Sequence, residues 1–508
     1  MPWVIRFTIL ALVLSCGPAL AQDAPKPVRL TITQKHIKDN FLTTWYAVYM
    51  KGKRFGYVMT KLAPGKYQGK PAYIEESEFV FLSKSGDATR KLNVSEKLIF
   101  GSSAPYPLQK ATEVIREQRK KRKTKQEIQL VRKGRQFEVT TIVGTNTSTK
   151  TIGDLDYTLA DVITPDVWEK SQPKVNDKIY YRSLSLSDLE VETRVRELKG
   201  SKKLEFNGVM TTVREFRSQK LDKSSPLTDY VDPKGKVLIS KLGTFELRRE
   251  SEKVAKKLDA PTDFFQEGLI KIDRGLKVHP HQVRSLILEV TAKNPRAIPS
   301  GPWQTVTPTT EGTAICLVGK KYGQRTKVTP EELKENLRAT LTYPAQNDRI
   351  KQLAKKAIGD AKTDLEKVKR LVKFVYRFIR PSYDNKGTLV LGLLDNPCGD
   401  CTAYASFFTT LARSVGIPAR EVGGFAYMGD IRRTFGGHAW NQVVINGCWH
   451  PIDASTGQFE IDAARVCLGA DRAANENLLS NFGTMKFRLV EVQSKQKTER
   501  AQGKANGQ

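Results

Sequence analysis

Residues 398–405 decide the fold of the C-terminal part of the chain, and they read Cys398-Gly399-Asp400-Cys401-Thr402-Ala403-Tyr404-Ala405. Apolar residues then follow the spacing of one helix face, at Tyr404, Ala405, Phe408, Leu411, Ala412 and Val415. Asp400 is a favoured N-cap, and Gly416 with Pro418 ends the helix. Cys401 therefore lies in the first turn, where N–H groups and the helix dipole stabilise a nucleophilic thiolate. Taken alone, such a cysteine is more often a small buried apolar residue.

Residues 437–453 are predicted to form a β-hairpin that brings a base and a carboxylate together. One strand reads Gly437-His438-Ala439-Trp440-Asn441-Gln442-Val443-Val444-Ile445, Asn446-Gly447 is the turn, and Cys448-Trp449-His450-Pro451-Ile452-Asp453 returns. In this register His438 is the diagonal neighbour of Asp453 on the same face. Diagonal Cα atoms lie roughly 7–8 Å apart, so a hydrogen bond from the imidazole to the carboxylate is within reach. Such a carboxylate orients the imidazole and fixes its tautomer.

A second histidine, His450, lies nearer to Asp453 in the sequence. The odd separation on one strand places the two side chains on opposite faces, although a longer turn would change this assignment. The chain has few other bases of this kind, because its histidines are His36, His279, His281, His438 and His450. The spacing does not show whether Cys401 contacts His438, because that contact depends on the fold.

Four motifs occur in a fixed order in this region. They read Gly399-Asp400-Cys401-Thr402-x-Tyr404-Ala405, Arg413-Ser414-Val415-Gly416-Ile417-Pro418-Ala419-Arg420, Gly437-His438-Ala439-Trp440-Asn441 and Trp449-x-Pro451-x-Asp453-Ala454-Ser455-x-Gly457-Gln458. Together they resemble the bacterial transglutaminase-like superfamily, which has a papain-like cysteine fold. The resemblance covers roughly residues 343–470, about a quarter of the chain. It implies that Cys401 is the catalytic nucleophile, His438 the base and Asp453 the orienting acid.

The sequence departs from the family pattern at two places. Gln442 stands where the family often has Glu, and Asp453-Ala454-Ser455 stands where Asp-Pro-Thr is common. Neither departure removes one of the three implied catalytic residues.

Cys398 raises a separate question, because it forms a Cys-x-x-Cys pair with Cys401. Such a pair suits a redox switch in which a disulfide silences the nucleophile, a thioredoxin-like site or half of a zinc site. No second cysteine pair at ligand spacing accompanies it, and Gly-Asp between the cysteines suits the transglutaminase-like interpretation. Five cysteines follow the first 21 residues, at Cys316, Cys398, Cys401, Cys448 and Cys467. An odd number leaves at least one thiol unpaired within the chain.

The N-terminal half is predicted to be rich in antiparallel strands, from about Thr43 to Arg249. Turn signals at Lys51-Gly52, Lys133-Gly134, Asn207-Gly208 and Asp232-Pro233-Lys234-Gly235 separate segments of alternating polarity. We expect a long curved antiparallel sheet or half-barrel with one helix at Leu159–Lys170. The preferred role is a structural module that positions the C-terminal domain, and an apolar-ligand or peptide site is the alternative.

The chain of 508 residues is expected to form an α+β protein with more than one domain. The predicted ranges are a signal peptide at 1–21, a β-rich N-terminal domain at 22–275 and a bridging β segment at 276–342. A transglutaminase-like catalytic domain at 343–492 and a disordered tail at 493–508 complete the chain. Helices are expected from about Asn347, and a last strand at Phe487–Val492.

The first residues predict export. Met1–Arg6 carries one positive charge, Phe7–Leu14 is apolar, and Ala19-Leu20-Ala21 resembles a cleavage site. Cys16 offers the alternative of lipid attachment. No later stretch reaches the roughly 20 apolar residues of a membrane-spanning helix. We therefore expect a periplasmic or secreted protein.

The net charge of +30 arises from 84 basic and 54 acidic residues. Such a surface favours anionic partners, for example acidic polymers of the cell envelope. The densest basic run is Arg119–Lys125, for which a solvated hairpin tip is the simplest interpretation and an anion-binding patch the alternative. No zinc-finger, RNP or helix-turn-helix pattern accompanies the charge, so a specific nucleic-acid function is not expected.

These observations predict a thiol enzyme that acts on amide bonds of proteins or peptides through an acyl-enzyme. Water as acceptor gives a peptidase or deamidase, an amine gives crosslinking, and hydrolysis is preferred. No cofactor or metal is expected, since no calcium-binding loop of the EF-hand kind is present. The alternative is a binding module on a thiol-enzyme scaffold, without catalysis.

Overall fold

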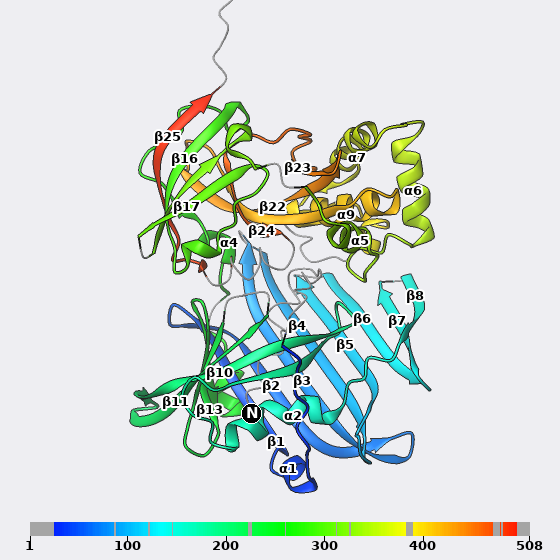
Figure 1. Cartoon of the computed structure of the whole chain (residues 1–508), viewed down its shortest axis with the longest axis vertical. Helices are drawn as coiled ribbons and strands as arrows, with labels where there is room; N and C mark the ends of the chain where they lie inside the picture. The colour runs from blue at the N-terminus through cyan, green and yellow to red at the C-terminus, as the bar shows by residue number, and fades with distance from the viewer. Residues whose placement is uncertain are drawn as a thin grey trace, which may run out of the picture.

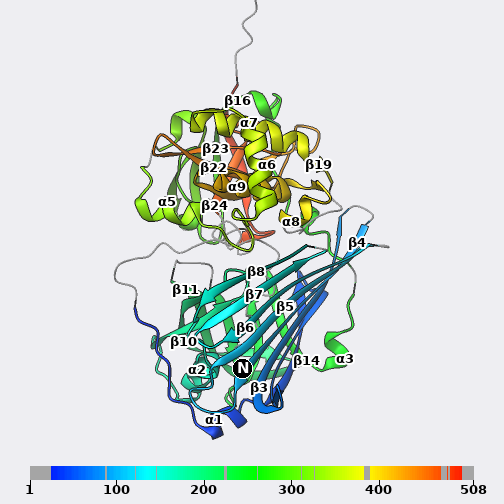
Figure 2. The same cartoon turned by 90° about the vertical axis from the view of Figure 1, so that its right-hand side faces the viewer.

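The computed structural model describes residues 25–494, except 86–87, 120–121, 145, 222–225, 260, 311, 325–326, 383–389, 471–477 and 479–480. The predicted signal peptide at 1–21, with Cys16, lies outside the described residues, as does the predicted tail from 495 onward. The described chain forms two bodies, one above the other in Figures 1 and 2. The lower body holds the first half of the chain and the upper body holds the second.

The lower body is a single curved antiparallel sheet of 14 strands, in the order β8-β7-β6-β5-β4-β3-β2-β1-β14-β13-β12-β11-β10-β9. The first eight strands are β1 Leu42–Met50, β2 Lys53–Tyr67, β3 Lys70–Ser85, β4 Ala88–Gly101, β5 Leu108–Arg119, β6 Arg122–Lys133, β7 Gln136–Val143 and β8 Asn146–Gly153. The other six are β9 Lys178–Ser185, β10 Glu190–Phe206, β11 Val209–Lys220, β12 Leu227–Val231, β13 Val237–Leu242 and β14 Phe245–Glu250. The predicted antiparallel sheet is confirmed.

Local turn chemistry sets the register of the hairpins. Asn207 and Gly208, between β10 and β11, have φ angles of 51° and 79°, as a two-residue hairpin turn requires. Lys51 and Gly52 do the same between β1 and β2, with φ angles of 49° and 78°. The basic run lies where β5 ends at Arg119 and β6 begins at Arg122, so the predicted hairpin is confirmed there.

Helix α2, at Leu159–Lys170, matches the predicted range. It begins with a capping box between Thr158 and Asp161 and packs its apolar residues into the same cluster as β6 and β7. Three short helices accompany the sheet: α1 Gln34–Lys38, α3 Glu252–Ala255 and α4 Phe264–Glu267.

A buried ion cluster joins α2 to β10–β13. Arg196 has 1% of its side chain exposed, and its Nε lies 2.5 Å from Glu169 and its Nη1 2.7 Å from Asp229. Ser240 donates a hydrogen bond of 2.5 Å to the other oxygen of Asp229. The guanidinium therefore compensates two carboxylates that are out of contact with water.

Replacing Arg196 by methionine is expected to lower the free energy of unfolding by about 3–5 kcal/mol, because Glu169 and Asp229 would lose their buried cation. Burial raises the pKa of Glu169 to about 7, so urea unfolding is best followed at about pH 8, where Glu169 is ionised. Arg217→Met, at a side chain that is 48% exposed, is the matched control and should change stability by at most about 0.5 kcal/mol. An Arg196→Met protein as stable as the parent would contradict this account.

The upper body begins with a four-stranded sheet in the order β17-β18-β16-β25. Its strands are β16 Val283–Thr291, β17 Gln304–Thr310, β18 Thr313–Val318 and β25 Lys486–Ser494, with short 3₁₀ helices at Pro280–Gln282, Pro295–Ala297 and Lys320–Tyr322. The last predicted strand is therefore confirmed, and it pairs with β16 along its whole length. This sheet shares one apolar cluster with the strands that carry the site described below.

One element in this region was predicted wrongly. Strands were expected throughout 283–343, but Pro330–Leu337 forms helix α5. Thr329 caps it in a capping box with Glu332, and Pro330 occupies the first turn. These start signals lie in the sequence and outweigh the strand-like composition around them.

The second sheet of the upper body has the order β15-β22-β21-β24, and β23 pairs with β22. The strands are β15 Ile270–Lys271, β21 Ala419–Tyr427, β22 Thr434–Ile445, β23 Cys448–Ile452 and β24 Arg465–Ala470. Its helices are α6 Asp348–Ile358, α7 Asp364–Phe378, α8 Val390–Leu393 and α9 Cys401–Ser414, and a parallel pair joins β19 Arg380–Pro381 to β20 Cys398–Gly399. The predicted helices from Asn347 onward and the α+β organisation are confirmed.

The two bodies touch through polar and aromatic contacts. Arg349 on α6 donates a hydrogen bond of 2.8 Å to Asn146 on β8, and Phe482 packs into the sheet cluster against Phe245. Burial lowers the pKa of Arg90 on β4, and the nearby carboxylates, among them Asp400 before α9, oppose that shift. The end of the lower sheet thus lies within electrostatic reach of α9. Among the described helices, none combines the length and the apolar character needed to cross a membrane.

Candidate active site

Helix α9 presents Cys401 as its first residue. Asp400 is the N-cap, with an extended backbone, and its side chain accepts a hydrogen bond of 3.1 Å from the amide of Thr402. The predicted helix and cap are confirmed. As the first residue of α9, Cys401 lies at the positive end of the helix dipole, and the residue is partly exposed.

The hairpin of β22 and β23 has the predicted register. Ile445 faces Cys448, and Asn446 and Gly447 form the turn with φ angles of 51° and 71°. The Nε2 atom of His438 lies 2.8 Å from Oδ2 of Asp453, which confirms the diagonal pair. His450 is engaged elsewhere, with its Nε2 3.2 Å from the carbonyl oxygen of Phe459.

The fold brings together what spacing left open, since the Cys401 side chain lies near enough to His438 to help raise the pKa of the imidazole. Asp453 only accepts hydrogen bonds when ionised, so Nε2 of His438 carries the proton that points to it. Nδ1 is then the nitrogen left for the thiol. The structure thus brings Cys401, His438 and Asp453 together, with the imidazole between the sulfur and the carboxylate.

Electrostatics favour a charged imidazole at this position. Burial disfavours the imidazolium, but the Asp453 carboxylate and the Cys401 side chain outweigh it and raise the pKa of His438 to about 10. Burial likewise disfavours the Asp453 carboxylate, but His438 and Arg465 hold its pKa well below the usual range. Proton transfer from thiol to imidazole therefore yields an ion pair that the carboxylate stabilises.

Asp453 is held rigidly on both of its oxygens. Its Oδ1 accepts hydrogen bonds from the amide and hydroxyl of Ser455, at 2.9 and 2.7 Å, and from the amide of Thr456 at 3.2 Å. Its Oδ2, which binds His438, also accepts a hydrogen bond of 2.9 Å from Nη2 of Arg465. The carboxylate is fully buried. It therefore has a single orientation available for the imidazole.

Residues 351–454 match the family model of the transglutaminase-like superfamily. The chain carries a transglutaminase-like core domain. The domain resembles kyphoscoliosis peptidase of Homo sapiens, at 25% identity over 124 residues, which are 22% of this chain and 19% of that protein. The Mus musculus protein is 24% identical over 139 residues, covering 25% of this chain and 21% of its own length. The chain thus spans about a fifth of the length of these curated relatives.

A solved structure described as a candidate cysteine protease, from Cytophaga hutchinsonii, is also similar. It shares 18% identity, the match covers 42% of this chain and 86% of that one, and the TM-score is 0.28.

Arg465 is a residue of the transglutaminase-like site that motif reasoning missed. Its side chain is 4% exposed, and besides Asp453 it contacts Asp462, with Nη1 2.5 Å from the Oδ1 atom. Asp462 in turn lies 3.0 Å from Nδ1 of His281, whose side chain is 48% exposed. The sequence signal was one cation within the mostly apolar stretch Ala463–Leu468, which by itself does not point to Asp453.

Asn441, the last residue of the motif His438–Asn441, ties β22 to α9. Its side-chain nitrogen donates a hydrogen bond of 2.8 Å to the carbonyl oxygen of Ala405 and one of 2.9 Å to the hydroxyl of Thr409. Both acceptors lie on the helix that begins with Cys401. This fully buried amide therefore sets the spacing between the strand of His438 and the helix of Cys401.

Gln442, which stands where the family often has Glu, forms a hydrogen bond with Arg420. Its Oε1 atom accepts 2.9 Å from Nε of Arg420, whose guanidinium carbon lies 3.9 Å from the centre of the Trp449 ring. Arg420 thus meets an amide where the family often has a carboxylate.

Cys398 is poorly placed for a disulfide with Cys401. β20 and the extended Asp400 separate the two cysteines, and an extended span of three residues is about 10 Å long. A disulfide needs Cα atoms about 4.4–6.8 Å apart. The Cys398 thiol instead donates 3.3 Å to the side-chain oxygen of Asn396. Within the part of the chain that the structure describes, no group of three or more His, Cys, Asp or Glu residues is arranged to hold a metal ion.

Proposed function

We propose that the transglutaminase-like domain is a cysteine acyltransferase or peptidase that acts on amide bonds of proteins or peptides. The observation that carries this proposal is that Cys401, at the start of α9, lies near His438, whose Nε2 atom is 2.8 Å from the Asp453 carboxylate. The raised pKa of His438 supports it, because an imidazolium is the form that protonates a leaving amine.

The reaction would proceed in two steps. The Cys401 thiolate attacks the amide carbon, and the oxygen of the tetrahedral intermediate lies near the N–H groups at the start of α9, the Cys401 amide among them. His438 gives its proton to the leaving amine, the C–N bond breaks, and a thioester remains. Water then attacks with His438 as base, the C–S bond breaks, and the thiol and a carboxylic acid result. An amine in place of water would give a new amide bond.

Hydrolysis is the form we propose first, because water is abundant and needs no binding site. Peptidase and deamidase activity both follow from it, depending on whether a peptide bond or a glutamine side chain is attacked. We also propose that the protein acts outside the cytoplasm, on the strength of the Met1–Ala21 pattern, where its positive charge suits anionic polymers of the envelope.

Selective alkylation tests the proposed nucleophile. At about pH 7, iodoacetamide should label Cys401 well before Cys316 and Cys467, since desolvation raises the pKa of Cys316 to about 12 and that of Cys467 to about 11. Rates follow from peptide mass spectrometry of timed samples. His438→Ala should slow labelling of Cys401 at least about tenfold, which separates activation of the thiol from mere exposure.

Labelling of Cys401 no faster than that of Cys316 would overturn the proposal that the domain is an enzyme. A binding module that retains the thiol-enzyme scaffold would then be the better account.

A further inference from the structure

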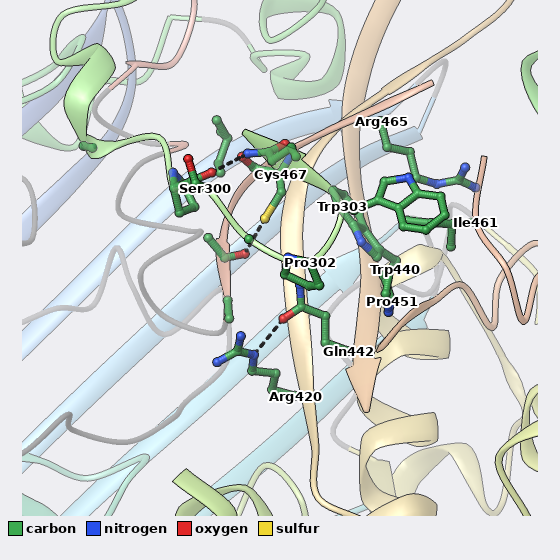
Figure 3. A pocket seen from close by; sticks show the side chains of 17 residues that line it. Ser300, Pro302, Trp303, Arg420, Trp440, Gln442, Pro451, Ile461, Arg465 and Cys467 are labelled. Atoms are coloured by element: carbon green, nitrogen blue, oxygen red, sulfur yellow. Dashed lines mark hydrogen bonds between the residues drawn. The ribbon is translucent and has the colours of Figure 1, made fainter. Parts of the chain in front are cut away.

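A cavity of about 300 Å³ is lined by Trp440 and Gln442 of β22 (Figure 3). Alternate residues of a strand share a face, so Trp440 and Gln442 follow His438 on that side and line the cavity. Arg420 on β21 and residues 467–470 of β24 belong to the same sheet, and the loop before β17 supplies the other wall. The volume lies at the lower end of small-molecule sites, about 300–1,000 Å³, and is far larger than one water requires.

Two residues connect this cavity with the proposed catalytic residues. The ring of Trp440 stacks on that of His438, with centroids 5.9 Å apart and an angle of 20° between the planes. Arg465 lines the cavity and binds the Asp453 carboxylate at 2.9 Å. The cavity is thus separated from the imidazole by a single side chain.

The chemistry of the walls is mainly apolar. The apolar lining residues include Trp303, Trp440, Ile461, Leu468, Pro302 and Pro451. The side-chain amide of Gln304 is hydrogen-bonded within the protein. Its nitrogen donates to the carbonyl oxygens of Pro299 and Cys467, and its oxygen accepts from the backbone amide of Cys467. An apolar group therefore finds few open polar partners along these walls.

The charges that line the cavity are of one sign. Arg420 and Arg465 are present, and none of the 17 described lining residues is Asp or Glu. A lysine or arginine side chain would enter beside two guanidinium groups without a lining carboxylate to receive it, and would lose its hydration.

The role of His438 as proton donor to the leaving amine indicates which side of the substrate lies next to the cavity. His438 protonates the leaving amine in the proposed mechanism, so the substrate chain that follows the attacked carbonyl passes the imidazole. Trp440 and the cavity lie next to that imidazole. The first side chain on the leaving-amine side is therefore the one nearest to the cavity.

We propose that this cavity binds a bulky apolar side chain, of the leucine or phenylalanine kind, on the leaving-amine side of the attacked amide and disfavours lysine and arginine there. The inference rests on the proposed function and adds a substrate class to it. The same cavity selects the amine in the reverse direction, when an amine attacks the thioester.

Amine capture tests the cavity without knowledge of the natural substrate. p-Nitrophenyl acetate acetylates Cys401, and amino-acid amides then compete with water for the acetyl group. The amine nitrogen bonds to the acetyl carbon, the C–S bond breaks, and the amine proton passes through His438 to the sulfur. Mass spectrometry of the N-acetyl amino-acid amides gives the partition between each amine and water.

Leucinamide and phenylalaninamide should capture the acetyl group at least about tenfold better than alaninamide, and lysinamide no better than alaninamide. Trp303→Ala should remove most of this preference because it deletes one wall. Trp303→Phe is the matched control: it also loses the hydrogen bond from the indole to the carbonyl oxygen of Asp462, 3.1 Å long, but keeps an aromatic wall and should keep the preference.

The outcomes separate the cavity from the thiol chemistry. Equal capture of all amides by a normally acetylated protein would overturn the cavity proposal and leave the proposed function intact. Preference unchanged in Trp303→Ala would overturn it as well. Failure to form any acetyl-enzyme would overturn the proposed function, and the cavity proposal with it.

Discussion

Replacing Cys401 by alanine is expected to abolish the burst of p-nitrophenolate and to lower amide or ester turnover at least about 10⁴-fold. The sulfur forms the covalent intermediate in the proposed mechanism, and His438 and Asp453 act through it. A stopped-flow burst and the mass of the intact protein, which gains one acetyl group, measure the effect. His438→Ala should cause a loss of similar size, and the double variant should lose little more, because the two residues act as one unit.

Cys448→Ala is the matched control for this experiment. Cys448 is also partly exposed. It lies at the turn end of the β22–β23 hairpin that carries His438, opposite Ile445. Its removal should leave the burst unchanged. A full burst in Cys401→Ala, or acetylation that maps to another residue, would contradict the assignment.

Asp453→Asn is expected to lower the rate of acylation by about 10³–10⁴-fold and to destabilise the protein as well. An amide can present its NH₂ group to Nε2 of His438 and so favour the wrong tautomer. It also leaves Arg465, with 4% of its side chain exposed, without half of its carboxylate partners, and such a loss typically costs about 3–5 kcal/mol.

The pH dependence carries a second signature of Asp453. The pKa of His438 is raised from 6.5 to about 10, so the stabilisation from this pair is complete below pH 6.5 and is lost as the pH rises to about 10. The lowered pKa of Asp453 means that its contribution is complete above pH 3.8 and is lost on further acidification. In Asp453→Asn the loss of protonated His438 should move to lower pH, as a histidine NMR titration would show.

Asp462→Asn provides the comparison that separates position from stability. Asp462 is equally buried and holds the same arginine, but it does not contact His438. This variant should lose a comparable free energy of unfolding while acylation falls less than about tenfold and the His438 pKa stays high. Equal losses of acylation in both variants would mean that Asp453 acts only through the fold.

Local patterns predicted the parts of the site that lie close together in the sequence. The Asp400 cap, the apolar face of α9 and the Asn446-Gly447 turn are each determined by neighbouring residues, so the hydrogen bond from His438 to Asp453 followed from the register. The contact of Cys401 with His438 did not, because it joins a helix to a strand that begins 33 residues later in the chain, α9 at Cys401 and β22 at Thr434. Arg465 was missed for the same reason, since a lone arginine has no local signal for the carboxylate it meets.

The N-terminal sheet shows the same division. Its hairpins were predictable from turn residues, but the pairing of β1 with β14, which joins the two halves of the sheet, depends on strands nearly 200 residues apart. Alternating polarity gives no information on which strands meet over such a distance.

The pairing of β16 with β25 has a consequence for the order of events during biosynthesis. β25 contributes Phe487 and Leu489 to the apolar cluster shared by both sheets of the upper body, and it ends at Ser494. Until β25 has left the ribosome, Cys401 and His438 have been synthesised, but the apolar cluster that supports the strand of His438 is still incomplete. The nucleophile and its base are thus assembled only after β25 has also been made.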